Sequence, residues 1–401
     1  MHRRLSALVL AGAFALVAGC STLPRNAPPV DLIGHTTIPG FTDIRSPAGM
    51  PSRAMALDLA RSYGEELRTD FPVGPDGVVT YALLTLSGGG PNGAFGSGVL
   101  KGWTETGKRP AFKVVTGVST GALMAPFAFL GSKYDAALED FYTTNPTQNI
   151  LRRLSILPQL FGGEAFAATD PLRALIEKHV DEHLLAAIAN AHRAGRRLYM
   201  GTANLDAQRF VIWNMGAIAA SGQPQALDIF RKVMLASASI PVAFPPVFFD
   251  VVANGERYDE LHVDGAVGAN VFLTGGMFSV SVVRRRAVTH QAREEIFVIH
   301  NGQLRPHAVQ TRRSIVGIAT RSFDGFARSG MVGDLFRIYA TALRDEAAFH
   351  WITIPDSATL SGDELFDPVI MANLFALGVK LGHEGPKWET LPPGLRYAEE
   401  E

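Results

Sequence analysis

Apolar runs of strand length alternate with stretches of helical periodicity along most of this chain. Strands are predicted in residues 81–86 and 112–116; a helix of small residues follows the first, and a short buried helix, which continues to residue 130, follows the second. Further strands are predicted in residues 198–203, 209–213, 247–252, 258–263 and 296–300, and further helices in residues 53–68, 135–142, 170–180, 184–194, 229–239, 315–326 and 335–349. Strands that alternate with helices are typical of a mainly parallel sheet covered on both faces. The pattern therefore predicts a three-layer α/β/α fold, with a hairpin at Asn254-Gly255.

The composition excludes several classes of partner. The chain has 401 residues, of which 47% are hydrophobic and 19% charged, and its formal net charge is −1. A chain so close to neutrality is not expected to bind nucleic acid. Its histidines and acidic residues show none of the spacings typical of metal ligands, so we expect no metal and no other cofactor. The only cysteine is Cys20, which excludes a disulfide within the chain.

The first 20 residues resemble the signal of a bacterial lipoprotein. A basic start is followed by an apolar stretch in residues 5–17, which ends in Leu16-Val17-Ala18-Gly19-Cys20. In such proteins the chain is cut before the cysteine, which then carries acyl chains that anchor it to a membrane. The resemblance implies a signal peptide in residues 1–19, lipidation of Cys20 and, because a serine follows the cysteine, an outer-membrane protein facing the periplasm. The alternative is an ordinary secreted protein with a chance cysteine.

Residues 20–52 are rich in proline and show little periodicity, so we expect an extended tether. Residues 53–401 are expected to form a single domain, with a core in residues 81–301 and a helical extension in residues 302–401. Residues 266–283 lack charge, but their glycines make them a poor membrane span, and we interpret them as buried core. The apolar residues in 151–166 are expected to pack in the core, with an acyl channel or a lid as the alternative.

A serine lies at a sharp turn between the second strand and its helix. The sequence of the turn is Gly117-Val118-Ser119-Thr120-Gly121. A serine at a strand-to-helix turn projects its hydroxyl group out of the sheet, and the residues two before and two after it must be small because strand and helix pass close together. The helix that follows also places the positive end of its dipole beneath the serine. Ser119 is therefore a candidate nucleophile.

A glycine-rich loop follows the first strand. Its sequence is Ser87-Gly88-Gly89-Gly90-Pro91-Asn92-Gly93. The spacing of Gly88, Gly90 and Gly93 fits a dinucleotide-binding turn, but such a site needs an acidic residue about 20 residues further on, where this chain has the serine turn. An oxyanion hole formed by backbone N–H groups of the glycines accounts for both turns and is the preferred interpretation.

The nucleophile needs a base. An ordinary α/β-hydrolase uses a histidine near the end of the domain. The candidates, none of which lies in a convincing turn, are His290, His300, His307 and His350. Asp264 is better placed, at the end of a predicted strand and before two small residues. A carboxylate can take the serine proton directly when burial raises its pKa towards neutrality. His262, two residues earlier, is interpreted as a structural residue.

Together these motifs resemble the patatin-like phospholipases, a family of serine lipid acyl hydrolases with a Ser–Asp dyad. The resemblance covers residues 81–301 and includes the glycine loop, the serine turn, Asp264-Gly265-Ala266 and the segment in residues 236–246. It implies that Ser119 is the nucleophile and Asp264 the base. It implies an oxyanion hole formed by the N–H groups of Gly88, Gly89 and Gly90. The residues that it places in supporting positions are Asn92, Gly93, Gly117, Gly121 and Gly265. The family often has Arg or Lys where this chain has Asn92.

The resemblance implies hydrolysis of carboxylic esters in phospholipids or lysophospholipids through an acyl-enzyme. Two alternatives stay open. The protein could be a general esterase or thioesterase, since the dyad does not determine the leaving group. It could instead be a non-catalytic envelope lipoprotein that binds lipid in the same pocket.

Overall fold

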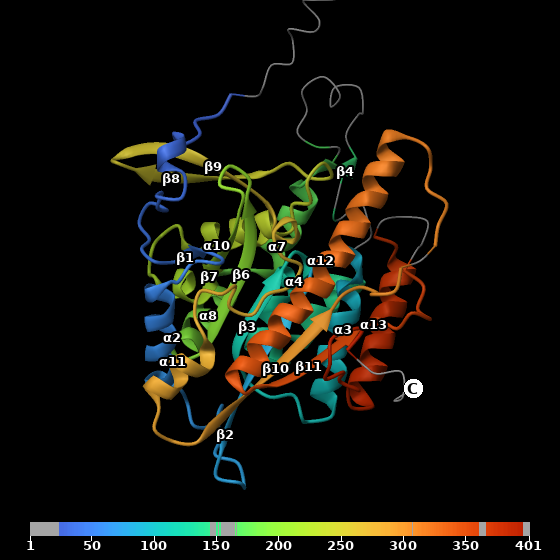
Figure 1. Ribbon diagram of the computed structural model, residues 1–401. Helices are drawn as coiled ribbons and strands as arrows, with labels where there is room; N and C mark the ends of the chain where they lie inside the picture. The colour runs from blue at the N-terminus through green and yellow to red at the C-terminus, as the bar shows by residue number, and fades with distance from the viewer. Residues whose placement is uncertain are drawn as a thin grey trace, which may run out of the picture.

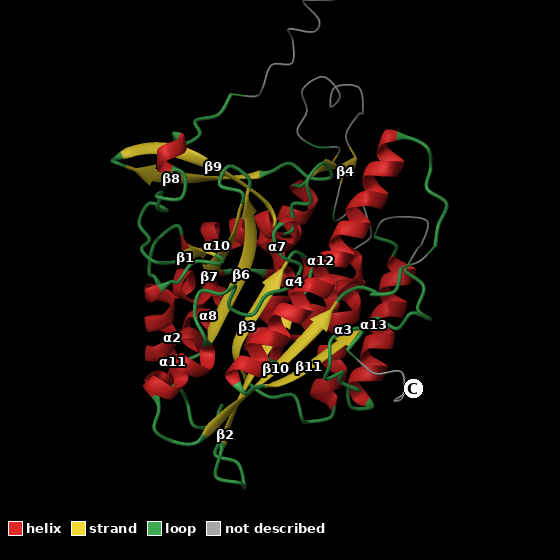
Figure 2. Cartoon of the chain, in the orientation of Figure 1, coloured by secondary structure: helices red, strands yellow, loops and turns green. Residues whose placement is uncertain are grey.

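A nine-stranded sheet lies at the centre of the described part of the molecule, with helices on both faces (Figures 1 and 2). The computed structural model describes residues 24–144, 150, 152–153, 165, 167–306, 308–360 and 366–395. Five neighbouring strands are parallel, in the order β6 (Arg197–Asn204), β3 (Phe112–Val118), β2 (Val79–Leu86), β10 (Ala292–His300) and β11 (Ala348–Thr353). Beyond β6, β7 (Arg209–Asn214) and β1 (Arg45–Pro47) are added antiparallel. The predicted α/β fold with a mainly parallel sheet is confirmed.

Each face of the sheet has its own apolar core, because successive side chains of a strand point to opposite faces. On β2, Tyr81 and Leu83 are buried in one core, and Leu84 and Leu86 in the other. The helices that pack on the first face are α2 (Arg53–Glu65), α11 (Val280–Ala287) and α12 (Ile315–Asp345). Those on the second face are α3 (Gly93–Glu105), α4 (Thr120–Leu130), α5 (Asp135–Thr143), α7 (Asp170–His179), α8 (Glu182–Arg193), α9 (Met215–Ala220), α10 (Ala226–Ser237) and α13 (Pro368–His383).

Most of the predicted elements are present, with ends shifted by a few residues. The helix predicted in residues 53–68 is α2, and the side chain of Ser52 caps it by accepting a hydrogen bond from the Met55 N–H. The predicted hairpin consists of β8 (Val247–Ala253) and β9 (Glu256–Asp264). Its turn residues Asn254 and Gly255 have φ angles of 50° and 85°, as a two-residue hairpin turn requires.

The C-terminal helix α13 packs against α3 at very short range. Each helix has a pair of glycines four residues apart, Gly98 and Gly102 on α3 and Gly378 and Gly382 on α13. A Cβ atom on any of the four would overlap a backbone carbonyl oxygen of the opposite helix. The C-terminal region is therefore an integral part of the fold, and it fixes α3, which begins at the glycine loop.

The prediction of an extended tether in residues 20–52 is wrong for the part that the structure describes. Strand β1 pairs with β7 at the edge of the sheet. Ile38, Phe41 and Ile44 are buried in the apolar core, and Arg25 forms ion pairs with two aspartates of the domain. These apolar side chains lie in irregular backbone, so they produce no periodic pattern in the sequence. The folded domain thus begins before residue 53.

The helical prediction for the C-terminal region is wrong in two places. Residues 315–345 form one continuous helix, α12, where two helices were expected. Its glycines weaken a helix by only about 1 kcal/mol each, and burial of Met331, Leu335 and Ile338 offsets this loss. Residues 348–353 form β11, a strand that was not predicted, so residues 302–401 are not a purely helical extension.

Other predictions fall partly or wholly on residues outside the described ranges. These are the signal peptide in residues 1–19, the lipidated Cys20 and most of the apolar stretch in residues 151–166. Within residues 266–283, Val271, Phe272 and Leu273 are buried, as expected for core. No helix among the described residues is long and apolar enough to cross a membrane.

Candidate active site

The serine turn and the aspartate come together because β3 and β9 share one edge of β6. Val118, the last residue of β3, pairs with Gly201 of β6. Strand β9 reaches the same edge antiparallel, and its last residue, Asp264, pairs with Thr202. Because Gly201 and Thr202 are consecutive, the ends of β3 and β9 lie next to each other. This register places Asp264 beside Ser119, which follows β3.

Ser119 occupies a strained backbone conformation, with φ 54° and ψ −125°. Its Oγ donates a hydrogen bond of 2.6 Å to Oδ2 of Asp264. The flanking glycines are required by close packing: a Cβ on Gly117 would overlap the carbonyl of Gly121, and a Cβ on Gly121 would overlap the carbonyl of Leu86. The turn therefore has the strained strand-to-helix geometry that the sequence predicts for a nucleophile whose hydroxyl group projects out of the sheet.

Ser237, the last residue of α10, supports the serine turn from the adjacent layer. Its Oγ accepts a hydrogen bond of 2.9 Å from the Ser119 N–H and donates one of 2.6 Å to the carbonyl of Gly201. The side chain is fully buried. Sequence analysis does not single out Ser237; the only signal is a run of small residues at 236–239. The contact fixes the backbone of Ser119 against β6.

Asp264 is buried, with 2% of its surface exposed. Its Oδ1 accepts a hydrogen bond of 2.8 Å from the Ala266 N–H, and its Oδ2 accepts the one from Ser119. Burial raises the pKa of Asp264 to about 7, and the two hydrogen bonds hold it below the value that burial alone would give. A carboxyl group with this pKa can both accept and return a proton near neutral pH.

The glycine loop offers two N–H groups beside the serine. Gly89 and Gly90 have φ angles of 154° and 55°, and a Cβ on Gly89 would overlap the backbone of Asn301. No described residue accepts a hydrogen bond from the N–H of Gly89 or Gly90. The Gly88 N–H, in contrast, donates to the carbonyl of Asn270 at 3.0 Å. The N–H groups of Gly89 and Gly90 are therefore available as donors for an oxyanion. The predicted oxyanion hole is corrected by leaving out Gly88, because its N–H group already has an acceptor.

Asn301 braces this loop from the end of β10. Its side-chain Nδ2 donates to the carbonyl of Ser87 at 2.9 Å, and its Oδ1 accepts from the Gly96 N–H at 3.1 Å. Its backbone N–H donates to Oγ of Ser87 at 2.9 Å. Sequence analysis missed Asn301. The available signal was a polar residue directly after a buried parallel strand, at the sheet edge where ligands bind in open α/β folds.

The other predicted motif residues lie around the same point. A Cβ on Gly93 would overlap Oγ1 of Thr120, and a Cβ on Gly265 would be too close to the carbonyl of Gly201. Asn92 precedes α3 and lines the hollow that contains Ser119.

None of the described candidate histidines bonds to Ser119. His300 shares a hydrogen bond of 2.9 Å with Oγ1 of Thr353, and burial lowers its pKa to about 3. His290 lies 3.2 Å from the hydroxyl of Tyr81. The ring of His350 stacks on that of Phe297, with centroids 4.9 Å apart. His307 lies outside the described ranges.

His262 has the structural environment that was predicted for it. It is fully buried, and its ring nitrogens lie 2.8 Å from Oγ1 of Thr202 and 3.2 Å from Oε2 of Glu260. Both ring nitrogens are thus occupied by partners away from Ser119.

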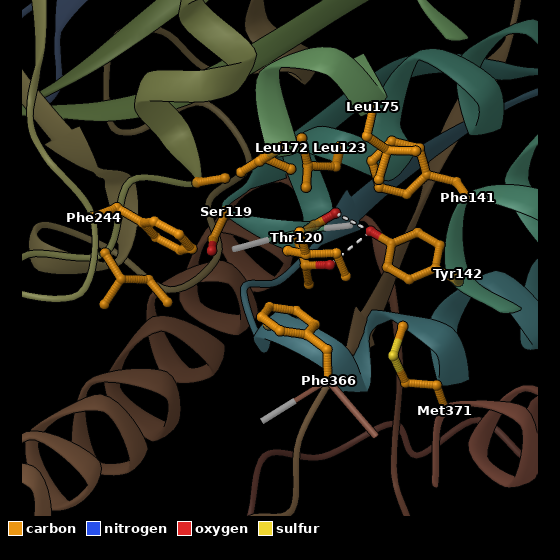
Figure 3. Close-up of a pocket in the computed structure, with 14 residues that line it drawn as sticks. Ser119, Thr120, Leu123, Phe141, Tyr142, Leu172, Leu175, Phe244, Phe366 and Met371 are labelled. Atoms are coloured by element: carbon orange, nitrogen blue, oxygen red, sulfur yellow. Dashed lines mark hydrogen bonds between the residues drawn. The ribbon is translucent and has the colours of Figure 1, made fainter. Parts of the chain in front are cut away.

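Two hollows meet at Ser119, one almost wholly apolar and the other with a mixed polar and apolar lining. The first, which we call the apolar pocket, is bounded on one side by the hydrogen-bonded pair Thr120 and Tyr142, with 2.6 Å between their side-chain oxygens. In Figure 3 the Ser119 hydroxyl points into this pocket, between aromatic and aliphatic side chains. Its apolar lining consists of Leu123, Phe141, Ile150, Leu172, Leu175, Ala238, Ile240, Phe244, Phe366 and Met371. Such a lining suits a hydrocarbon chain.

The second hollow, the polar cleft, is wider and contains both Ser119 and Asp264. Its polar and charged lining also includes Asn92, Asn270, His300, Asn301, Gln303, Asp324 and Arg328. Arg328 lies on α12 and is the only lysine or arginine among the described lining residues. It forms no ion pair or hydrogen bond with any described residue. Its charge is therefore available to an anionic group in the cleft.

Among the described residues, no group of three or more histidine, cysteine, aspartate or glutamate side chains could hold a metal ion.

One comparison with known proteins identifies a family for the region that contains the site. A family model described as Patatin-like phospholipase matches residues 84–275, a range that includes the glycine loop, Ser119 and Asp264. No curated protein sequence matches the chain. Among solved structures, the crystal structure of VipD from Legionella pneumophila is similar, with a TM-score of 0.40 and 12% identity over 79% of this chain and 69% of that chain. The family model thus identifies a patatin-like phospholipase domain, with the patatin fold, in residues 84–275.

Proposed function

We propose that this protein hydrolyses carboxylic esters of phospholipids or lysophospholipids through a Ser119–Asp264 dyad. Membership of the family supports lipid acyl hydrolysis in general. One observation carries the finer proposal: the 2.6 Å hydrogen bond from Ser119 to Asp264 lies where the apolar pocket meets the polar cleft. An ester held across this junction would have its acyl chain on one side and its alcohol on the other.

In the first half of the proposed reaction, Oγ of Ser119 attacks the ester carbonyl carbon and its proton passes to Oδ2 of Asp264. The negative charge that develops on the carbonyl oxygen is stabilised by the N–H groups of Gly89 and Gly90. The bond between the carbonyl carbon and the alcohol oxygen then breaks. Asp264 returns the proton to that oxygen, and the alcohol leaves an acyl group on Ser119.

In the second half, a water molecule attacks the acyl carbonyl carbon and gives a proton to Asp264. The same two N–H groups stabilise the second tetrahedral intermediate. When the bond to Oγ of Ser119 breaks, Asp264 returns the proton to the serine and the fatty acid leaves. One carboxyl group thus acts as base and acid in turn, which suits a pKa of about 7.

The polar cleft suggests which alcohols the site accepts. Arg328 has no partner among the described residues. Asn92 is neutral, whereas the family often has Arg or Lys at that position. Arg328 is therefore proposed to bind the phosphate of a phospholipid headgroup, a role for which its guanidinium is well suited. This contact would favour phospholipids over neutral esters.

The proposed location of the enzyme is a bacterial outer membrane, facing the periplasm, with Cys20 lipidated. The support for this location is the lipobox-like ending of the apolar stretch and the serine that follows it. Palmitate labelling of the expressed chain, with Cys20→Ala as the negative control, tests the anchor independently of the enzyme activity.

The function is tested with a panel of substrates and one covalent probe. Purified protein is offered phospholipid, lysophospholipid, a short-chain soluble ester and a thioester, and a fluorophosphonate probe is used to label the nucleophile. We expect fatty-acid release mainly from the phosphate-bearing lipids. We also expect the fluorophosphonate probe to label the wild type but not Ser119→Ala. Faster turnover of the soluble ester or thioester would indicate a general esterase or thioesterase. The absence of both turnover and labelling would indicate a lipid-binding protein.

A further inference from the structure

The N-terminal half of α12 projects from the body of the protein. From Met331 onwards the helix has buried residues, among them Met331, Leu335 and Ile338. In residues 317–330, by contrast, no described side chain is buried. Figure 1 shows this half, which we call the α12 arm (residues 315–330), extending past the carboxyl ends of β3 and β10. The first half of this 31-residue helix thus contributes no described side chain to the apolar core in which the second half is buried.

The α12 arm exposes large apolar side chains to solvent. Ile318 is 54% exposed and Phe326 is 76% exposed. Ile318, Ser322 and Phe326 follow at four-residue spacing, so they lie along one face of the helix. Phe323 and Arg328 belong to the lining of the polar cleft, which lies on a different face. The arm therefore presents an apolar face outwards and a second face, which carries the charged residues Asp324 and Arg328, to the active site.

The surroundings of this apolar face are basic. Residues 312–328 contain four arginines and one aspartate, whereas the whole chain has a net charge of −1. Arg312 and Arg313, directly before the helix, are exposed. An apolar helix face with neighbouring basic residues is typical of segments that lie in the interface of an anionic membrane. Because the arm borders the polar cleft, a bilayer in contact with the arm would lie near the entrance to the active site.

The first described residues lie on the same side of the molecule as the α12 arm. In Figure 1 the first described residues, the α12 arm and the carboxyl ends of β3 and β10 all point to the top of the view. We propose that the α12 arm docks on an anionic phospholipid bilayer, with Ile318 and Phe326 inserted among the lipids and Arg312 and Arg313 on the phosphates. This inference rests on the proposed function, because it explains how a lipid substrate reaches Ser119.

The experiment measures binding to vesicles separately from catalysis. Every described element lies after residue 23, so a chain that starts at Ser21 retains the fold without an acyl anchor. Ser119→Ala in this chain is mixed with vesicles of phosphatidylcholine alone or with 30% phosphatidylglycerol, and the bound fraction is determined by co-sedimentation. We expect binding only to the anionic vesicles.

Two variants remove the arm's contacts, and each has a matched control. Ile318→Ser with Phe326→Ser is compared with Leu343→Ser, because Leu343 is 63% exposed on the other half of the same helix. Arg312→Gln with Arg313→Gln is compared with Arg285→Gln and Arg286→Gln, an exposed arginine pair on α11. We expect at least about a tenfold loss of vesicle affinity for each arm variant and less than a twofold change for each control.

Hydrolysis of a soluble short-chain ester, measured with Ser119 intact, shows that the arm variants are folded and separates the two proposals. Vesicle binding through the arm without any ester hydrolysis would refute the function and leave the docking surface standing. Normal hydrolysis with arm variants that bind vesicles like their parent would overturn the docking proposal. A change from dimer to monomer in Phe326→Ser, with vesicle binding unchanged, would identify the face as a contact between two copies and would also overturn it.

Discussion

The hydroxyl group of Ser237 accepts a hydrogen bond of 2.9 Å from the backbone N–H of Ser119, and it donates one to Gly201 on β6. This side chain connects the strained serine turn to Gly201 of β6. The next residue of β6, Thr202, pairs with Asp264. Both residues of the proposed dyad are thus held by two consecutive residues of β6. The 2.6 Å contact between Ser119 and Asp264 depends on this shared support.

Ser237→Ala should lower kcat with little change in KM, because it removes the hydrogen bond that holds the Ser119 backbone. A loss of about tenfold is expected for one buried hydrogen bond. Ser239→Ala is the matched control, since Ser239 is also buried but its hydroxyl bonds only to the carbonyl of Leu235. Equal losses in the two variants, measured by ester hydrolysis, would show that Ser237 has no positioning role.

The activity should depend on the ionisation of Asp264. The carboxyl group must be deprotonated to accept the Ser119 proton, so kcat/KM should rise with pH through about 7 and level off above it. The rate profile of His300→Ala should keep the same midpoint, because burial holds the pKa of His300 at about 3. If the midpoint moves in His300→Ala, the pH dependence of the rate belongs to His300 and not to Asp264.

The same shift predicts how stability depends on pH. Because the folded protein binds the Asp264 proton more tightly than the unfolded chain does, this stabilisation is complete below about pH 4 and is lost as the pH rises through about 7. The free energy of unfolding of wild type should therefore decline between about pH 4 and pH 7, and this decline should exceed that of Asp264→Asn by a few kcal/mol. Parallel curves would contradict the assigned pKa.

Gly121→Ala should destabilise the protein by about 3 kcal/mol or more, because the added Cβ would overlap the carbonyl of Leu86. Gly64→Ala is a suitable control, as a Cβ there meets no atom and the residue lies in α2. It should leave stability unchanged or raise it by up to about 1 kcal/mol. Denaturant unfolding of both variants tests the close approach of β2 and α4.

Arg328→Gln should raise KM for a phospholipid about tenfold and leave hydrolysis of a neutral soluble ester unchanged, because only the phospholipid has a phosphate that the arginine can bind. Arg285→Gln, an exposed arginine on α11, provides the comparison. If both substrates are affected equally by Arg328→Gln, the residue supports the cleft but does not recognise a headgroup.

The parts of the fold that the sequence predicts are those with a strong local signal. Strands β2 and β3 are long apolar runs that end in glycine turns, and the β8–β9 hairpin has an Asn-Gly turn. The elements that were mispredicted lack such a signal. Helix α12 is interrupted by glycines yet stays continuous, because its second half packs on the sheet. Strand β11 is short and becomes a strand through its parallel pairing with β10.

The site divides in the same way. Ser119, Asp264 and the glycine loop each lie at a strand end with a recognisable turn, so sequence alone predicts them. Ser237, Asn301 and Arg328 contribute through contacts between distant segments, which no local pattern specifies. The engagement of the Gly88 N–H by Asn270 is likewise a tertiary contact, and it could not be anticipated from the glycine motif.

The Ser119–Asp264 dyad is tested most directly by fatty-acid release from mixed phospholipid micelles. The release is measured side by side for wild type, Ser119→Ala, Asp264→Asn and His300→Ala. We expect Ser119→Ala to be inactive, Asp264→Asn to lose about a thousandfold or more of the activity, and His300→Ala to stay within a few-fold of wild type. An active Asp264→Asn together with an inactive His300→Ala would contradict the dyad and assign the base to the histidine.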